Sequence, residues 1–213
     1  MPPGQPTTVL LVRHGTTPTT GRFLPGRAPG LHLSETGRAQ AQKVAARLAA
    51  LHQRPVAVYA SPLERARETA APIARALGLR VRTERELVEL DIGEWTGMSL
   101  KRAMRRKEWA AVQHWPTGFR FPGGETFAEL AARVTDAVLR LADAHRGETV
   151  VAVSHADPIR AAIATAAGMP LDLFQRLVIA TCSVSAVAYP PDGLGPRILC
   201  VNSSADGLGG VPG

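Results

Sequence analysis

The chain has 213 residues, which fits one sizeable domain, and its 45% hydrophobic and 20% charged residues exclude a wholly disordered protein. A net charge of +7, carried mostly by arginine, would suit nucleic acid, a membrane surface or small anions. We favour small anions, because the arginines are scattered among acids in predicted helices and form no basic tail; most of them are explained by a solvated basic surface.

Strands and helices are predicted to alternate through most of the chain. Short apolar runs rich in β-branched residues predict strands at 8–12, 56–60, 79–83, 149–153, 183–189 and 197–201. Apolar positions at helical spacing predict helices through 39–51, over 62–77, over 124–145 and from residue 159. Ser34 is expected to cap the first helix, Pro62 to lie early in the second and Gly78 to end it.

The segments between these elements differ in character. Loops rich in Gly, Pro and polar residues are expected at 16–33 and 86–97, and a flexible Gly-rich tail at about 203–213. Residues of about 98–121 are basic and aromatic, and we interpret them as a small helical cap inserted over the domain. Trp109 and Trp115 are expected to form the core of this cap.

The alternation predicts an α/β fold, a three-layer α/β/α sandwich around a mostly parallel mixed sheet, in a single domain covering 1–213. Ligands of such sheets bind beyond the carboxyl ends of the strands. Three predicted strands run into the polar segments VLLVRHG, VAVYASPLERARET and VVAVSHADPIR. The residues that they bring to this edge are Arg13, His14, Arg65 and His155. Core packing hardly explains such a convergence.

Two histidines and two arginines together predict a phosphate pocket. The planar guanidinium group matches phosphate oxygens with two parallel hydrogen bonds. A neutral imidazole is a competent nucleophile near pH 7 when its other nitrogen is held by a hydrogen bond. His14, fixed by the turn at Gly15, could therefore attack phosphorus, while Arg13, Arg65 and His155 would stabilise charge on the equatorial oxygens.

A leaving alkoxide needs a proton, so a carboxylic acid should lie near this pocket. The candidates in the loop after the third strand are Glu89, Asp91 and Glu94. A solvated loop carboxylate is the alternative interpretation of Glu89. The chain shows no metal-binding motif and no Walker loop, so we expect neither a metal nor a cofactor.

Other residues have simpler interpretations that compete with a functional one. His14 and His155 could be structural histidines, and Arg65 could form an ion pair with Glu64 or Glu68 on a helix surface. A basic cluster in the predicted cap consists of Lys101, Arg102, Arg105, Arg106 and Lys107. We interpret this cluster as a solvated helix face; its functional alternative is attraction of an anionic substrate.

The cysteines and the N-terminus bear on the compartment. Cys182 and Cys200 stand in apolar, strand-like contexts, and we expect both to be buried free thiols in a reducing compartment. The start of the chain has no positive region before its short apolar run, which predicts a core strand and neither a signal peptide nor a membrane span. We therefore expect a cytoplasmic protein with no membrane partner.

The chain resembles the histidine phosphatase (phosphoglycerate mutase-like) superfamily. The segments that carry the resemblance, in family order from about residue 9 to 202, are LVRHGTT, GR…PGLHLSETGRAQA, SPLERARETA, LVELDIGEWTG, PGGETFAELAARV and VSHADPIRA. The resemblance implies that His14 is phosphorylated and that Glu89, four residues before Gly93, donates the proton. It implies that the phosphate-binding partners are Arg13, Arg65 and His155. Asp91 and Glu94 do not match the donor position and are interpreted as a loop-stabilising acid and a surface residue.

Three positions depart from the family pattern. Thr16 follows the RHG tripeptide where the family often has Glu, and Thr20 stands where it often has Asn. Thr20 can still bind phosphate, through one hydroxyl. Asp157 replaces a glycine that is usual after the second histidine, where its carboxylate could orient His155 or repel a phosphate dianion.

These observations predict a metal-independent phosphatase that hydrolyses small phosphate esters through a phosphohistidine. A phosphoglycerate-type mutase is the alternative, but such mutases carry a longer, proline-rich insertion between the Glu89 loop and the GGE helix. A phospho-ligand sensor or a nucleic-acid-binding module is the non-enzymatic alternative; the complete Arg/His/Arg/Glu/His set argues against the first and the scarcity of interleaved aromatic and basic residues against the second. The substrate and the choice between monomer and homodimer stay open.

Overall fold

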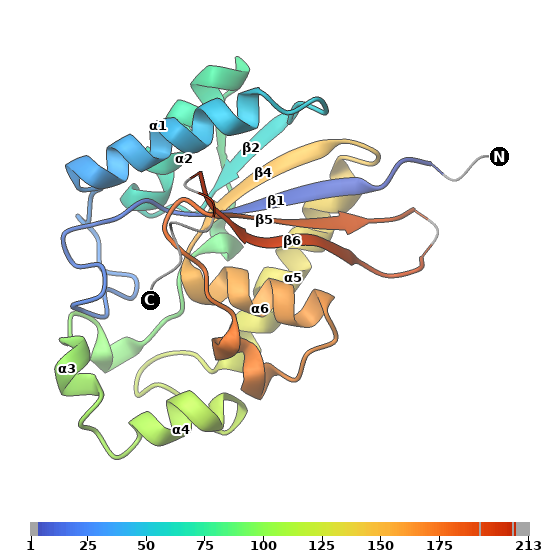
Figure 1. Cartoon of the computed structure of the whole chain (residues 1–213). Coiled ribbons are helices and arrows are strands. Elements are labelled where there is room, and N and C mark those ends of the chain that lie inside the picture. The colour runs from blue at the N-terminus through green and yellow to red at the C-terminus, as the bar shows by residue number, and fades with distance from the viewer. Residues whose placement is uncertain (1–3, 192, 206, 208–213) are drawn as a thin grey trace.

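A six-stranded mixed sheet forms the centre of the protein in a computed structural model that describes residues 4–191, 193–205 and 207 (Figure 1). The strands are β1 (Thr7–Arg13), β2 (Ala57–Ala60), β3 (Val81–Thr83), β4 (Thr149–Ser154), β5 (Val184–Tyr189) and β6 (Arg197–Ser203). Their order is β3-β2-β4-β1-β5-β6, with β3, β2, β4 and β1 parallel and the β5–β6 hairpin antiparallel. The predicted mixed α/β sheet is confirmed.

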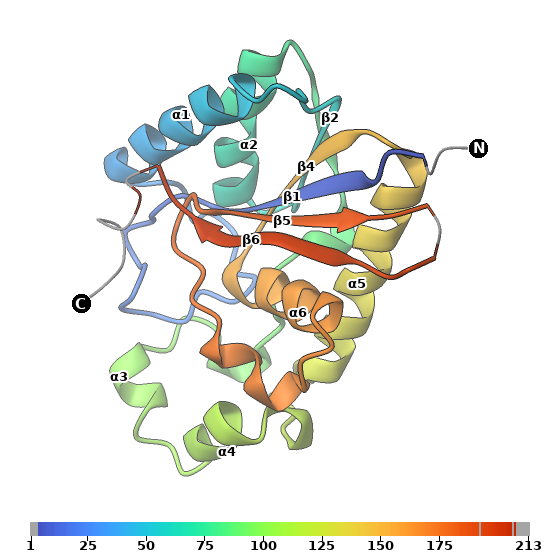
Figure 2. The same cartoon turned by 45° about the vertical axis from the view of Figure 1, so that its right-hand side comes forward.

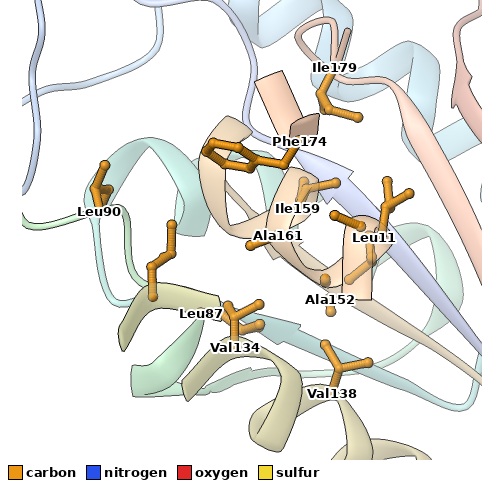
Figure 3. Close-up of a cluster of buried hydrophobic side chains, with 14 of the residues drawn as sticks. Leu11, Leu87, Leu90, Val134, Val138, Ala152, Ile159, Ala161, Phe174 and Ile179 are labelled. Carbon is orange, nitrogen blue, oxygen red and sulfur yellow. The ribbon is translucent and has the colours of Figure 1, made fainter. Parts of the chain in front are cut away.

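Helices cover both faces of this sheet. Figure 2 shows α1 (Glu35–Ala49) and α2 (Glu64–Leu77) on one side, and α5 (Phe127–Ala144) and α6 (Ala156–Ala166) on the other. The central strand β1 is buried on both faces, as its continuous apolar run predicts. Leu10 and Val12 pack towards α1 and α2, whereas Val9 and Leu11 belong to the cluster beneath α5 and α6. Part of that second cluster is drawn in Figure 3.

The register of the parallel strands aligns their carboxyl ends. Arg13 of β1 lies opposite Ser154 of β4, and Ala60 of β2 lies opposite Val153. The backbone N–H of the next residue after β1, His14, donates to the carbonyl of Ser154 at 2.9 Å. The first residues beyond β1, β2 and β4 are therefore neighbours at one edge of the sheet.

Local sequence signals set most helix ends. The hydroxyl of Ser34 accepts from the N–H of Gly37 at 3.1 Å, and Gly78 ends α2 in the left-handed conformation (φ 72°). Three helix starts differ from prediction. Helix α5 begins at Phe127, three residues later than expected, because Thr126 is its N-cap. Pro62 lies before α2, whose N-cap is Leu63. Helix α6 begins three residues earlier than expected, because His155 is extended and serves as its N-cap.

The segment 98–121 lies away from the sheet, and its later part contacts the 3-10 helix η4 (Leu171–Arg176) that follows α6 (Figure 1). It contains α3 (Leu100–Ala103), α4 (Trp109–His114) and a 3-10 turn (Pro116–Gly118). Trp109 packs partly against the core as expected, but Trp115 is 60% exposed, so its predicted core position is wrong. Its ring lies over the turn that follows, where a Cβ on Gly118 would meet it at 2.4 Å.

Three further expectations concern the cysteines, the tail and the membrane. Cys182 is a buried free thiol as predicted, but Cys200 is exposed, because β6 is the edge strand and has half its side chains in solvent. Ser203 still belongs to β6, and most of the remaining predicted tail lies outside the described residues. No helix in the described part of the chain is long and apolar enough to cross a membrane.

Candidate active site

Five of the six predicted site residues lie at or near the carboxyl ends of the parallel strands. Arg13 ends β1 and His14 follows it, Arg65 lies in the first turn of α2, and His155 follows β4. Glu89 lies in the loop after β3, beyond a 3-10 turn (Arg85–Leu87). The structure thus gathers residues from four separate segments.

His14 is held as a neutral imidazole with a defined tautomer. Its side chain is buried, and Nδ1 lies 2.8 Å from the carbonyl oxygen of Gly15. Because a carbonyl only accepts, Nδ1 carries the proton and Nε2 keeps its lone pair. Burial, reinforced by the positive charges of Arg13 and Arg65, lowers the pKa of His14 to about 3. The ring is therefore unprotonated at Nε2 at neutral pH, where its lone pair is available.

His155 faces His14, with 5.1 Å between the ring centroids and 59° between the ring planes. It is fully buried, and its Nε2 lies 2.7 Å from the hydroxyl of Ser61. The hydroxyl of Ser61 also accepts from the N–H of Leu63 at 3.4 Å, and its own proton can go to Nε2 of His155. Burial first, and then the charge of Arg65, lower the pKa of His155 well below its usual value. Its Nδ1 makes no hydrogen bond within the described residues.

Arg65 is fully buried and Arg13 partly buried, and both have hydrogen-bond donors without a partner in the described part of the chain. One terminal nitrogen of Arg13 donates to the carbonyl of Ile179 at 2.6 Å, and one of Arg65 donates to that of Gly26 at 2.9 Å. The Nε of both residues and the second terminal nitrogen of Arg65 are buried and lack a partner in the described part of the chain. Buried cationic donors of this kind are costly unless an anion binds them. A phosphate group meets that need.

The alternative interpretation of Arg65 as part of a surface ion pair is wrong, because Arg65 has no exposed surface. The two neighbouring acids have other partners. Glu64 accepts from the N–H of Gly30 at 3.0 Å, and Glu68 accepts from the N–H of Leu33 at 2.8 Å. Both therefore hold the loop before α1 against α2.

Glu89 is a half-buried acid whose proton is retained near neutrality. Burial, and then the negative charge of Asp157, raise its pKa to about 7, against the opposing influence of Arg65 and Arg13. Its Oε1 accepts from the N–H of Leu90 at 2.9 Å. An acid that titrates near 7 can both give and take a proton at neutral pH.

The other two acids of this loop have the places expected for them. Asp91 accepts from the N–H of Gly93 at 3.0 Å and pairs with Arg27 at 3.3 Å, which stabilises the loop. Glu94 is exposed. Neither residue is a better donor candidate than Glu89.

Thr20 and Asp157, which depart from the family pattern, both bond to other residues of the protein. The hydroxyl of Thr20 accepts from the N–H of Thr17 at 2.9 Å and so closes a local turn. Asp157 pairs with Arg160 at 2.8 Å, one turn along α6. The partner that orients His155 is instead Ser61, which the sequence reasoning missed; its position directly after β2, at the same edge as His14, is the signal that could have found it.

Three residues of the basic cluster in the 98–121 segment have two different surroundings, one against Trp95 and one around a surface hollow. Arg106 lies over the ring of Trp95 at 5.1 Å and pairs with Glu108 at 3.3 Å, so it has a packing role. Lys101 and Arg105 line an open hollow of about 550 Å³. The other residues of this hollow are Gly21, Arg22, Leu100 and Met104. Three positive charges surround this hollow, which suits an anion near the surface.

The described residues contain no group of three or more His, Cys, Asp or Glu side chains that could hold a metal ion. Two buried neutral histidines, two arginines with buried, unpartnered donors and a carboxyl whose pKa is raised to about 7 are instead groups that suit phosphoryl-group chemistry on an α/β sheet. The chain belongs to the histidine phosphatase superfamily (branch 1), whose family model matches residues 9–203. The resemblance inferred from the six sequence segments is confirmed.

Curated relatives, one of them named as a phosphatase, are similar along most of the chain. Phosphoserine phosphatase 1 of Hydrogenobacter thermophilus is 33% identical over 188 residues, which cover 84% of this chain and 85% of the relative. The bifunctional protein Rv2228c of Mycobacterium tuberculosis is 36% identical over 194 residues, or 89% of this chain. The chain spans about half (52%) of the length of that relative.

Solved structures show the same fold. YhfR of Bacillus stearothermophilus has a TM-score of 0.84 at 26% identity, covering 92% of this chain and 97% of that one. Mycobacterial glucosyl-3-phosphoglycerate phosphatase in complex with VO3 has a TM-score of 0.81 at 25% identity, covering 92% and 99%.

Proposed function

We propose that this protein is a metal-independent phosphatase that hydrolyses small phosphate monoesters through a phosphohistidine on His14. The observation that carries the proposal is the set of buried, unpartnered donors around a neutral histidine. These donors are Nε of Arg13 and Nε and one terminal nitrogen of Arg65, joined by Nδ1 of His155 in the tautomer whose Nε2 accepts from Ser61. They come from three segments and match the several oxygens of one phosphoryl group.

The reaction divides into two displacements at phosphorus. In the first, the lone pair on Nε2 of His14 forms the N–P bond while the P–O bond to the leaving group breaks, and Glu89 gives its proton to that oxygen. In the second, Glu89 takes a proton from water as the water oxygen attacks phosphorus, which breaks the N–P bond and releases phosphate. Arg13, Arg65 and His155 bind the equatorial oxygens throughout.

The names of relatives support a phosphatase that acts on a small organic phosphate. We also propose that the 98–121 segment is a cap that lies over this bound substrate. A phosphomutase using the same pocket is the second candidate, because phosphoglycerate mutase-like protein 4 of Arabidopsis thaliana is 38% identical over 157 residues. The two differ in the acceptor of the second step, which is water in a phosphatase and a second substrate hydroxyl in a mutase.

The test is hydrolysis of an aryl phosphate by protein treated with chelator. We expect turnover without added metal, competitive inhibition by vanadate, and an acid-labile phosphoenzyme in the wild type that the variant His14→Ala lacks. The variant His52→Ala, which removes an exposed histidine in the loop after α1, is the matched control and should retain both. A requirement for a divalent metal, or near-normal turnover by His14→Ala, would refute the mechanism.

A further inference from the structure

We propose that Glu125, held between Arg27 and Arg133, is the residue that positions Glu89 for proton transfer, an inference that rests on the function proposed above. These three residues are called the positioning triad below. Arg27 lies in the loop before α1, Glu125 in the turn before α5, and Arg133 on α5. The side-chain hydrogen bonds of the triad go to one another and to the loop that carries Glu89, so its members are positioning residues.

Arg133 uses all five of its N–H donors in this arrangement. One terminal nitrogen donates to the carbonyls of Glu86 at 2.6 Å and Val88 at 2.9 Å. The other donates to the carbonyl of Glu89 at 3.1 Å and to Glu125 at 2.7 Å, and Nε donates to Glu125 at 3.0 Å. Three backbone carbonyls within four residues are thus fixed by one guanidinium group, whose side chain is only 15% exposed.

Arg27 holds the same point of the loop from the opposite direction. Its Nε donates to the carbonyl of Glu89 at 2.8 Å, so that carbonyl accepts from both arginines of the triad. Arg27 also directly follows Gly26, whose carbonyl accepts from Arg65 at 2.9 Å. The backbone of Gly26 and Arg27 therefore links the proposed proton donor to a proposed phosphate ligand.

Glu125 joins the two arginines. Its carboxylate accepts two hydrogen bonds from Arg133, one from Arg27 at 3.0 Å and one from the backbone N–H of Asp91 at 2.9 Å. The side chain is 14% exposed, so removal of its charge would leave two cations with little solvent and no shared counter-ion. The arginines would then move, and the loop that carries Glu89 would move with them.

The turn before α5 and the Glu89 loop are packed closely, backbone against backbone. A Cβ on Gly124 would lie 2.3 Å from the carbonyl oxygen of Asp91, so the turn before α5 and the Glu89 loop are in direct backbone contact. The N–H of Glu125 donates to that same carbonyl at 2.9 Å. The triad therefore fixes a loop whose position decides how far the carboxyl of Glu89 lies from the leaving oxygen. A displacement of about 1 Å at such a distance can cost about 100-fold in rate.

The experiment compares Glu125→Gln with Glu129→Gln in the whole protein. Glu129 lies one turn further along, where its side chain bonds Arg120 and the N-cap Thr126 in place of the Glu89 loop. Each variant is assayed on an alkyl phosphate, whose leaving group needs a proton, and on an activated aryl phosphate, which does not. For Glu125→Gln we expect kcat to fall about 10- to 100-fold on the alkyl ester and less than threefold on the aryl ester, with little change in KM. Glu129→Gln should leave the ratio of the two rates unchanged.

The pH profile gives a second readout that a general loss of folding would not produce. Burial is the main cause that raises the pKa of Glu89, so a loosened loop that admits water should lower this pKa. The alkaline limb of alkyl-ester hydrolysis should then move to lower pH in Glu125→Gln and stay in place in Glu129→Gln. If Glu125→Gln fails to fold, the variant Arg27→Met, at a more exposed position, tests the proposal in its place. It should show the same selective loss of alkyl-ester hydrolysis to a smaller extent.

Glu89→Gln, measured alongside, separates failure of this inference from failure of the proposed function. Selective loss on the alkyl ester in Glu89→Gln but not in Glu125→Gln or Arg27→Met would overturn the positioning role alone. Absence of selective loss in Glu89→Gln would overturn the proposed role of Glu89 itself. Equal slowing of both esters by Glu125→Gln, in a folded protein, would show a structural role only.

Discussion

Substitution of Arg65 should lower activity strongly without lowering the stability of the folded protein. The residue is fully buried, and two of its three nitrogens make no hydrogen bond within the described residues. A buried cation without a partner destabilises the folded state, whereas the same cation stabilises a phosphoryl group that is losing its leaving group. Substitution by Met, which has similar length and no charge, removes both effects.

The expected magnitudes follow from the contacts. Loss of one preorganised donor to a transition state costs about 10²–10³ in rate, and Arg65 offers two such donors together with a charge, so Arg65→Met should lower kcat/KM by about 10³ or more. In the folded protein the substitution removes one hydrogen bond, to Gly26, worth about 1 kcal/mol. Relief of the buried charge should gain about 1–4 kcal/mol. The free energy of unfolding should therefore be unchanged or raised.

The assay combines steady-state kinetics with thermal unfolding in phosphate-free buffer. A gain of 1 kcal/mol corresponds to about 2–4 °C in Tm for a chain of this size. Vanadate should raise the Tm of the wild type and leave that of Arg65→Met unchanged. The variant Arg65→Lys keeps the charge without the planar fork and should lose about 10²-fold in kcat/KM. An Arg65→Met variant with nearly normal kcat/KM and a clearly lowered Tm would refute the reasoning, because Arg65 would then be a structural residue.

Four further predictions concern pH, packing and surface charge. Because the pKa of Glu89 is about 7, hydrolysis of alkyl phosphates should decline as the pH rises through 7, and Glu89→Gln should flatten that limb; a limb that persists would assign it to another group. The pKa of His14 is about 3 when folded and near 6.5 when unfolded, so the unfolded state binds more protons between these values. The histidine therefore contributes stability that is complete above pH 6.5 and declines on acidification; chemical denaturation from pH 7 to 4 should show a slope that the variant His14→Asn reduces. Gly37→Ala would place a Cβ 2.0 Å from a backbone carbonyl of the loop that follows His14, and should lower the free energy of unfolding by about 1–3 kcal/mol together with kcat; a variant as stable and active as the wild type would contradict this contact. Reversal of charge at Lys101 and Arg105 should raise KM for anionic substrates at low salt, with an effect that disappears at high salt, whereas equal KM at all ionic strengths would leave this hollow without a role in attraction.

The sequence by itself determined the residues that local rules control. An apolar run followed by Arg-His-Gly defines where β1 ends, so the sequence alone places Arg13 and His14 at the edge of the sheet. The caps at Ser34 and Gly78 depend on hydrogen bonds and φ angles within a few residues, and they were placed correctly for that reason. The same rules misplaced the start of α6, because the extended conformation of His155 is set where β4 ends, and not by the helical pattern after it.

Only the tertiary structure decided which atoms meet. Periodicity indicates which face of an element is buried, but it does not specify partners that are far apart in the chain. The bond between His155 and Ser61 joins residues 94 positions apart, and that from Arg27 to the carbonyl of Glu89 joins residues 62 apart. The free donors of Arg65 and the raised pKa of Glu89 follow from desolvation by several segments at once. Desolvation depends on the surroundings of a group in three dimensions, so the sequence named the chemical groups of this site while the packing of distant segments set their protonation and their partners.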